Sequence, residues 1–278
     1  MTFPDRTGAP PAYLDLGGRG PGLIPGAEAA IPADDRGLLY GDGLFETVLA
    51  LDGALPLLPL HLERLAGSAR ALGIPCEPER VAEAARLVAE AAGPGEQALR
   101  ITLSRGAGAA RGYAPPAGPR PTLLITAAPY HRPAGPLTAI TASLRVHPDS
   151  PLARHKSLSA LEKVMARAEA ARAGVDEALL LNTAGRLAEG AATNLFLLTP
   201  AGWLTPPVGE GCLPGVMRRQ MLALTGAREA PITPEELHRA DGVYLTSALL
   251  GCLPLARLDG RPLRMGPPPP ALAALLGH

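Results

Sequence analysis

Lysine is rare in this chain, and its two positions are candidates for chemistry. The 26 basic side chains comprise 24 arginines and two lysines, Lys156 and Lys163. A lysine amine can form a Schiff base with a carbonyl compound, whereas an arginine guanidinium cannot. Burial, or the neighbouring cations Arg154 and His155, would favour the neutral, nucleophilic amine of Lys156. We therefore identify Lys156 as the candidate nucleophile, with a solvated surface lysine as the alternative, and expect Lys163 on a solvated helix face beside Glu162.

A single carboxylate lies in a run of small residues that follows a predicted strand and turn. Glu189 stands in Leu187-Ala-Glu-Gly-Ala-Ala-Thr-Asn-Leu-Phe196, where glycine and alanine let a flat ligand approach closely. A buried glutamate paired with a pyridine nitrogen would keep that nitrogen protonated. An ordinary surface turn would have the same composition, so both interpretations stay open at this point.

Three further segments could bind anions. Gly211–Arg218 precedes a predicted helix, whose first-turn N–H groups and dipole would attract a phosphate. Arg64 lies on another predicted helix and could bind a phosphate through two parallel hydrogen bonds. Arg105, Arg111 and Tyr113 lie in a glycine-rich loop that could hold substrate carboxylates, although it lacks the GxGxxG and GxxxxGK[ST] signatures. An ordinary helix start, a surface arginine and a packed loop are the respective alternatives.

Apolar periodicity predicts the strands and helices that would position these groups. The expected strands are Ala12–Leu16, Phe45–Leu51, Ala98–Ser104, Thr122–Ala127, Thr138–Val146, Glu177–Leu181, Leu195–Leu198 and Val243–Thr246. The expected helices are Leu60–Leu72, Pro78–Ala92, Ser159 to about Ala173, and Pro214–Leu224. Asp52-Gly53 predicts a hairpin with a return strand at Ala54–Leu58, and Ser159-Ala-Leu-Glu162 predicts a helix capping box. The alternation of strands and helices along the chain is typical of an α/β or α+β protein.

Length and composition limit the class of protein. The 278 residues suffice for one large domain or two small ones, and 47% hydrophobic with 19% charged residues is typical of a globular chain. Equal numbers of basic and acidic residues, 26 of each, argue against a nucleic-acid surface. The composition of residues 129–136 predicts a linker between a domain of residues 1–128, with residues 1–30 partly flexible, and a domain of residues 137–278.

Several kinds of site and location are not expected. The sequence has no run of 18 apolar residues and no signal-peptide layout at its start, so we expect no membrane partner. The three cysteines share no CxxC spacing and the six histidines are scattered, so no metal site is expected. An odd number of cysteines suits a reducing compartment, and we expect a cytoplasmic protein.

Five motifs together resemble the class IV aminotransferase family, the fold-type IV pyridoxal-phosphate enzymes. They are Asp35-Arg-Gly-Leu-Leu-Tyr-Gly-Asp-Gly-Leu-Phe-Glu-Thr47, His61-Leu-Glu-Arg-Leu65, His155-Lys-Ser-Leu158, Ala188-Glu-Gly-Ala-Ala-Thr-Asn-Leu-Phe196 and Leu213-Pro-Gly-Val-Met-Arg218. Each motif is weak alone. All five occur in the family's order over about residues 31–257, which makes the resemblance specific.

The resemblance implies a small N-terminal α/β domain and a larger C-terminal domain of pseudo-barrel character. It implies pyridoxal 5'-phosphate as the cofactor, a small-molecule substrate, and a homodimer whose active site lies between the domains near the dimer interface. By motif match, Lys156 would carry the cofactor and shuttle protons, and Glu189 would bind the pyridine nitrogen. The other implied cofactor contacts are Arg64, the backbone N–H groups of Val216 and Met217, and Ser247. The implied substrate contacts are Phe45, Arg105, Arg111 and Tyr113.

The family contains lyases and transaminases, and the glycine-rich loop distinguishes among them. Ser104–Tyr113 resembles the Arg-Gly-x-Gly…Arg-Gly-Tyr loop of the aminodeoxychorismate lyases with one extra residue, whereas D-amino acid aminotransferases have a histidine at the position of Tyr113. Branched-chain aminotransferases carry Phe-Glu-x-x-Arg-x-Tyr, but Leu49 and Leu51 stand at its Arg and Tyr, and Leu161 replaces a further Tyr. The resemblance favours a lyase that releases pyruvate to give 4-aminobenzoate for folate biosynthesis. A transaminase for D-amino or branched-chain amino acids is the alternative.

Two hypotheses from other classes of protein remain open. A non-catalytic cofactor-binding protein of the same fold would carry Lys156 without turnover. A nucleotide-binding α/β module would use the loop Arg105–Tyr113 to bind adenine nucleotides. The missing Lys-Ser/Thr phosphate signature argues against the second of these.

Overall fold

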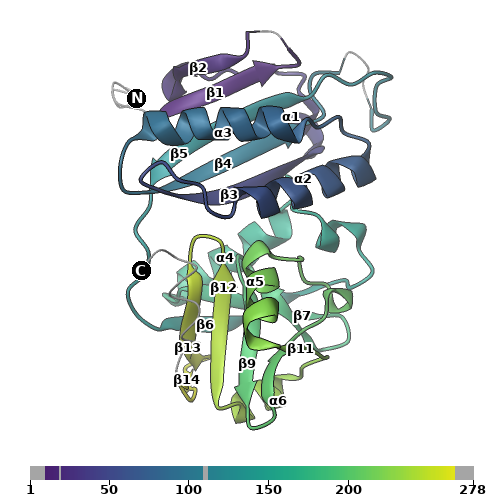
Figure 1. Ribbon diagram of the computed structural model, residues 1–278. Helices are drawn as coiled ribbons and strands as arrows, with labels where there is room; N and C mark the ends of the chain where they lie inside the picture. The colour runs from purple at the N-terminus through teal and green to yellow at the C-terminus, as the bar shows by residue number, and fades with distance from the viewer. Residues whose placement is uncertain (1–9, 19, 109–111, 267–278) are drawn as a thin grey trace. The chain divides into compact units, whose positions relative to one another are not determined.

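The computed structural model describes residues 10–18, 20–108 and 112–266. The chain divides into two compact units, Met1–His131 with Lys156–Ser159, and Arg132–His155 with Ala160–His278. Each unit is built around its own sheet (Figure 1). The sequence predicted residues 137–278 as one continuous domain, so the assignment of Lys156–Ser159 to the first unit differs from that expectation.

The first unit is a five-stranded antiparallel sheet in the order β2-β1-β5-β4-β3, with helices packed on one face (Figure 1). Its strands are β1 (Pro11–Leu16), β2 (Gly22–Pro25), β3 (Gly43–Leu51), β4 (Glu96–Ser104) and β5 (Thr122–Pro129). Its helices are α1 (Arg36–Tyr40), α2 (Leu58–Leu72) and α3 (Pro78–Ala92), with a 3-10 turn at Gly26–Glu28. A proline in the first turn and a glycine after the last residue set the ends of both long helices.

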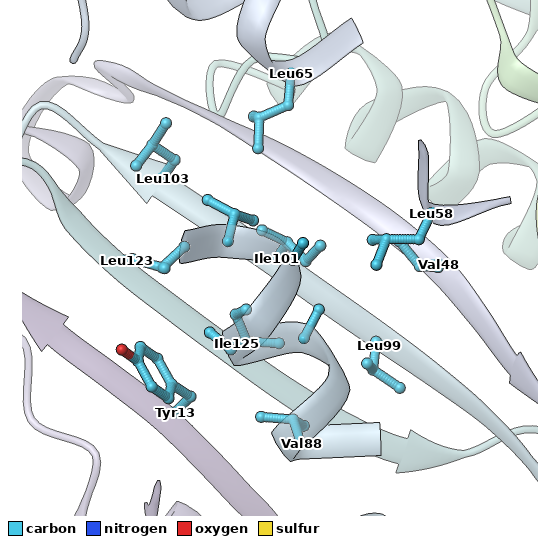
Figure 2. Packing of buried hydrophobic residues seen from close by; sticks show 14 of the residues in the cluster. Tyr13, Val48, Leu58, Leu65, Val88, Leu99, Ile101, Leu103, Leu123 and Ile125 are labelled. Atoms are coloured by element: carbon cyan, nitrogen blue, oxygen red, sulfur yellow. The ribbon is translucent and has the colours of Figure 1, made fainter. Parts of the chain in front are cut away.

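The core of the first unit lies between the sheet and the two long helices. Alternation along β3 and β4 directs Val48, Leu99 and Ile101 toward α2 and α3, where Leu65 and Val88 complete the cluster (Figure 2). All five side chains are at most 1% exposed, and burial of each contributes roughly 1.5–3 kcal/mol. Residues at the alternate positions of these strands therefore face the opposite side of the sheet.

The second unit contains a nine-stranded mixed sheet that curls into half of a barrel. Its order is β11-β10-β9-β12-β13-β6-β7-β8, with β14 paired to β13, and the pairs β13-β6, β6-β7 and β10-β11 are parallel. The strands are β6 (Leu137–Val146), β7 (Glu177–Asn182), β8 (Leu187–Gly190), β9 (Asn194–Thr199), β10 (Gly202–Thr205), β11 (Arg228–Glu229), β12 (Gly242–Ser247), β13 (Gly251–Leu258) and β14 (Arg261–Pro262).

Three helices belong to the second unit: α4 (Leu161–Ala173), α5 (Val216–Thr225) and α6 (Pro234–Arg239). α4 packs against β6 and β7, and α5 packs against β12 (Figure 1). Two 3-10 turns lie at Pro151–Arg154 and Val208–Glu210. The mixed α/β architecture that the sequence predicted is confirmed.

Two predicted elements differ from the structure. The return strand expected at Ala54–Leu58 is reduced to one bridging residue, because Leu58 already begins α2. The capping box expected at Ser159 does not form, and Ala160 is the N-cap of α4. Ser159 Oγ donates instead to the backbone oxygen of Gly41 at 3.3 Å, which ties this end of the lysine segment to the first unit.

Candidate active site

Lys156 lies in an extended segment that continues the first sheet beyond its edge strand, β3. Phe45 N donates to Lys156 O at 2.8 Å, and Leu158 N donates to Gly43 O at 2.9 Å. Gly43 permits this approach, because a Cβ built on it would lie 2.7 Å from the Leu158 side chain. These bonds fix the backbone on both sides of the candidate nucleophile.

The ring of Phe45 contacts two cationic side chains. Lys156 Nζ is 4.5 Å from the ring centroid, and Arg100 Cζ is 3.9 Å from it. Contacts of this geometry are cation–π interactions, each worth about 0.5–2 kcal/mol. Phe45, expected as a substrate contact, thus lies beside the candidate nucleophile.

Arg100 is a site candidate that the sequence analysis missed. Burial lowers the pKa of its guanidinium, and no carboxylate among the described residues forms an ion pair with it. Its side chain is nevertheless accessible from solvent, so an anion can reach this guanidinium. The available signal in the sequence was a charged residue between the apolar residues Leu99 and Ile101 of β4.

Among its core-facing positions, β3 carries one buried carboxylate. Glu46 is 1% exposed and accepts hydrogen bonds from His61 Nδ1 at 2.7 Å and from Arg64 Nε at 2.8 Å. Burial alone would raise the pKa of Glu46, but the hydrogen bonds from Arg64 and His61 outweigh it, so its pKa is lowered. Arg64, expected at the phosphate, is therefore oriented by Glu46, and its phosphate contact stays a prediction.

His61 is neutral at pH 7, because burial lowers its pKa below the ordinary value of 6.5 although Glu46 opposes the shift. Its Nδ1–H then donates to Glu46. Its Nε2 is buried without a hydrogen-bond partner among the described residues. The imidazole thus stays unprotonated in the folded protein under conditions that protonate it in the unfolded chain.

We expect the free energy of unfolding to fall as the pH drops from 7 to 5. Below about pH 6.5 the unfolded chain gains a proton on His61 that the folded protein does not take up, and this costs up to about 1.4 kcal/mol per pH unit. Urea unfolding at several pH values measures the slope. His61→Gln should flatten this part of the curve, and an unchanged slope in that variant would assign the effect to another group.

Glu189 lies on β8 and is 3% exposed, so an exposed surface turn does not describe its position. Leu213 N donates to Glu189 Oε2 at 3.0 Å, and Lys163 of α4 forms an ion pair with Oε1. Lys163 was expected on a solvated face beside Glu162, and the ion pair corrects that expectation. Because the two carboxylate oxygens have about four acceptor positions, a protonated ring nitrogen could still bind.

The start of α5 offers backbone donors to an anion. Val216 and Met217 form its buried first turn, and the N-cap Gly215 makes no side-chain cap. A Cβ built on Gly215 would lie 2.0 Å from Asn194 Oδ1, so glycine lets the backbone pass close to β9. First-turn N–H groups lack partners within their own helix, and together with the helix dipole they suit a phosphate.

The residues present fit pyridoxal phosphate in their chemistry. The first unit contains an aldehyde-reactive amine at Lys156 and a guanidinium at Arg64. The second contains a buried carboxylate at Glu189 for a ring nitrogen, the first turn of α5 for a phosphate, and the hydroxyl of Ser247 at the end of β12. The structure thus places the predicted cofactor contacts in two groups, one in each unit.

The glycine-rich loop is held by an arginine that the site prediction did not include. Arg36 donates to the backbone oxygens of Tyr113 at 2.8 Å and of Gly112 and Ala114 at 3.2 Å each. Its guanidinium lies 4.9 Å from the Tyr40 ring, which in turn makes an edge contact with the Tyr113 ring. The hydrogen bond from Arg36 fixes the backbone of Tyr113. Its side chain is accessible, because Tyr113 is 87% exposed.

Arg105 is used in packing. It is 7% exposed, its Nε donates to Asp42 at 2.8 Å, and its two terminal nitrogens donate to the backbone oxygens of Gly73 and Leu72 at 2.8 and 2.9 Å. The two terminal nitrogens thus hold the loop to the end of α2, and Nε holds it to Asp42 between α1 and β3. This use in packing gives no support to the expected substrate contact of Arg105. Arg111 lies outside the described residues.

Within the described ranges, no cluster of three or more His, Cys, Asp or Glu side chains could hold a metal ion. Among the same residues, no helix combines the length and apolar character needed to cross a membrane.

Comparison with known proteins identifies the family. The profile of the family "Amino-transferase class IV" matches residues 43–258. A "Putative branched-chain-amino-acid aminotransferase" of Methanocaldococcus jannaschii is 33% identical over 244 residues, covering 84% of each chain. An "Aminodeoxychorismate lyase" of Vibrio harveyi is 31% identical over 243 residues, covering 82% of this chain and 88% of the relative.

Solved structures agree with the sequence relatives. The branched-chain aminotransferase of Thermoproteus uzoniensis with norvaline superposes with a TM-score of 0.87 at 28% identity, covering 97% of this chain and 96% of the other. The chain belongs to the class IV aminotransferase family. It is a pyridoxal 5'-phosphate-dependent enzyme, either a lyase or an aminotransferase, as the motifs predicted.

Proposed function

We propose that this enzyme is a 4-amino-4-deoxychorismate lyase, which releases pyruvate from its substrate and leaves 4-aminobenzoate. The observation that carries the proposal is the Arg-Gly-Tyr sequence ending at Tyr113. Arg36 donates hydrogen bonds to the backbone oxygens of its Gly112 and Tyr113 and of the following Ala114. The lyases that this loop resembles carry the same segment. A fixed backbone suits a substrate-recognition loop, because it limits the positions that the Tyr113 side chain can take.

Guanidinium groups support a substrate with two carboxylates. Arg100 lies against the Phe45 ring beside Lys156 and has no carboxylate partner among the described residues. Arg111 adds a second arginine, within the Arg-Gly-Tyr segment. Aminodeoxychorismate bears two carboxylates, whereas a simple aliphatic amino acid bears one, and guanidinium binds carboxylate well.

A transaminase is the second candidate, and the similarity to the Methanocaldococcus jannaschii protein favours it. Three positions argue against a branched-chain transaminase in particular. Leu49 is a buried apolar residue of β3, Leu51 ends that strand, and Leu161 is an exposed residue at the start of α4. These positions carry polar Arg and Tyr residues in the branched-chain enzymes that the sequence resembles, and here they offer no polar group.

The mechanism follows from the chemistry of the side chains. Pyridoxal phosphate, when bound, supplies an aldehyde that condenses with amines and a protonated ring that accepts an electron pair. Lys156 Nζ would hold the cofactor, and as a free amine it would remove the proton from the substrate carbon that bears the amino group. Nζ then returns a proton to the departing pyruvate as the substrate ring aromatises. Glu189 keeps the ring nitrogen protonated, and the first turn of α5 binds the phosphate.

The test is to offer the purified holoenzyme aminodeoxychorismate with no 2-oxo acid. We expect 4-aminobenzoate and pyruvate in equal amounts, because elimination needs no amino-group acceptor. In parallel, D-alanine and L-leucine are each offered with a 2-oxo acid. Amino-group transfer from either, together with no 4-aminobenzoate in the first assay, would establish the transaminase instead.

A further inference from the structure

α4 places a cation on the carboxylate that we assign to the cofactor's ring nitrogen. Lys163 forms an ion pair with Glu189 Oε1, and the Glu189 side chain is 4% exposed. The Lys163 side chain is 38% exposed, so its stem runs inward from solvent to a buried partner. This is the second of the chain's two lysines, and the proposed mechanism does not use it.

The carboxylate is held from two directions. Besides Lys163 of α4, Leu213 N donates to Glu189 Oε2 at 3.0 Å, from the segment that leads into α5. Each contact holds one of the two carboxylate oxygens. The ring nitrogen of the cofactor would be a third donor. It would bind a carboxylate whose position is fixed and whose negative charge is already paired with Lys163.

Among the described contacts of Glu189, Lys163 is the one cationic side chain. The thiol of Cys212 lies within electrostatic range of Glu189. Burial raises the pKa of this thiol to about 12, so the thiol is neutral. Arg218 also lies within electrostatic range of Cys212, but it forms an ion pair with Glu229. The charge on Lys163 is therefore the one that a ligand on Glu189 would encounter.

An ammonium and a protonated ring nitrogen on one carboxylate repel each other. Two like unit charges about 4 Å apart shift an equilibrium roughly fivefold in water, and more where the surroundings are partly dry. We propose that Lys163 is a positioning residue that sets how strongly Glu189 holds the protonated ring nitrogen of the cofactor. This inference rests on the proposed role of Glu189 in the mechanism above.

The test compares the binding of two cofactors to the cofactor-free full-length enzyme. One is pyridoxal phosphate, and the other is its 1-deaza analogue, which has a C–H group in place of the ring nitrogen. The ratio of their dissociation constants measures the preference for the nitrogen and cancels effects common to both ligands. Fluorescence quenching on titration gives both constants without any measurement of turnover.

We expect Lys163→Met to raise the preference for pyridoxal phosphate roughly tenfold, because the repelling charge is removed. Lys163→Arg should keep the wild-type preference, since it retains the charge. Arg167→Met is the matched control, because it removes a cation from α4 and an ion pair with another buried carboxylate, Glu177. It should leave the ratio unchanged. Lys163→Gln is the second neutral variant, in case the methionine variant does not fold.

Glu189→Gln separates the failure of this inference from the failure of the proposed function. If Glu189→Gln lowers the preference for the nitrogen but the neutral Lys163 variants stay within twofold of the wild type, the role of Lys163 is overturned and that of Glu189 stands. If Glu189→Gln leaves the preference unchanged, another group faces the ring nitrogen and the proposed role of Glu189 is overturned. A raised preference in Lys163→Arg equal to that in Lys163→Met would also overturn the charge effect.

Discussion

Lys156→Met is expected to reduce turnover by at least roughly 10²–10⁴-fold, which is the usual contribution of a positioned proton-transfer group. The loss of the covalent hold on the cofactor adds to this effect. The fold should persist, because the backbone hydrogen bonds between the Lys156 segment and β3 do not depend on the side chain of Lys156. Steady-state kinetics with aminodeoxychorismate and thermal unfolding of the same sample measure the two effects.

Chemical labelling provides an independent check on the same residue. Borohydride reduction of the holoenzyme, followed by peptide mapping, should place the pyridoxyl group on Lys156. Because Lys163 is the other lysine, the map has two possible lysine peptides. A label on Lys163, or substantial turnover in Lys156→Met, would contradict the assignment.

Glu46→Ala is expected to destabilise the protein by about 3–5 kcal/mol. The substitution leaves the guanidinium of Arg64 and the imidazole of His61 without their shared carboxylate in a buried setting, and breaking one side of a buried ion pair costs this much. Urea unfolding should show a lower midpoint with an unchanged slope.

Glu83 on α3 offers a matched control for Glu46. It is an exposed glutamate of the same unit, so Glu83→Ala should change the free energy of unfolding by no more than about 0.5 kcal/mol. If Glu46→Ala has as small an effect as this control, the buried group contributes little to stability. In that case the lowered pKa of Glu46 would also need another explanation.

Local patterns predicted the elements with strong periodicity. Helices α2 and α3 were expected almost at their observed ends, because apolar residues recur at helical spacing between a proline and a glycine. β3, β4 and β5 were expected for the same kind of reason, since their alternate residues enter one core. The short strands β2, β8, β10, β11 and β14 were not expected, because two to four residues carry too little pattern. The longer β13 was also not expected.

Contacts that depend on distant residues could not be predicted from local patterns. Ser159 followed by Glu162 has the spacing of a capping box, but backbone oxygens at Tyr40 and Gly41 compete for the serine hydroxyl. Lys163 was placed in solvent because Glu162 is its neighbour in sequence, whereas its partner Glu189 lies 26 residues further on. Arg100 was missed because nothing in its own strand indicates that Phe45 and Lys156 lie beside it.

The position of Lys156–Ser159 in the first unit has a consequence for synthesis of the chain on the ribosome. Residues up to His131 supply all five strands of the first sheet, but the segment that covers the free edge of β3 follows only after Arg132–His155. At ordinary translation rates, that segment emerges roughly one to six seconds after His131. During this interval the edge of β3 is open to pairing with other nascent chains, and arrival of Lys156–Ser159 closes it.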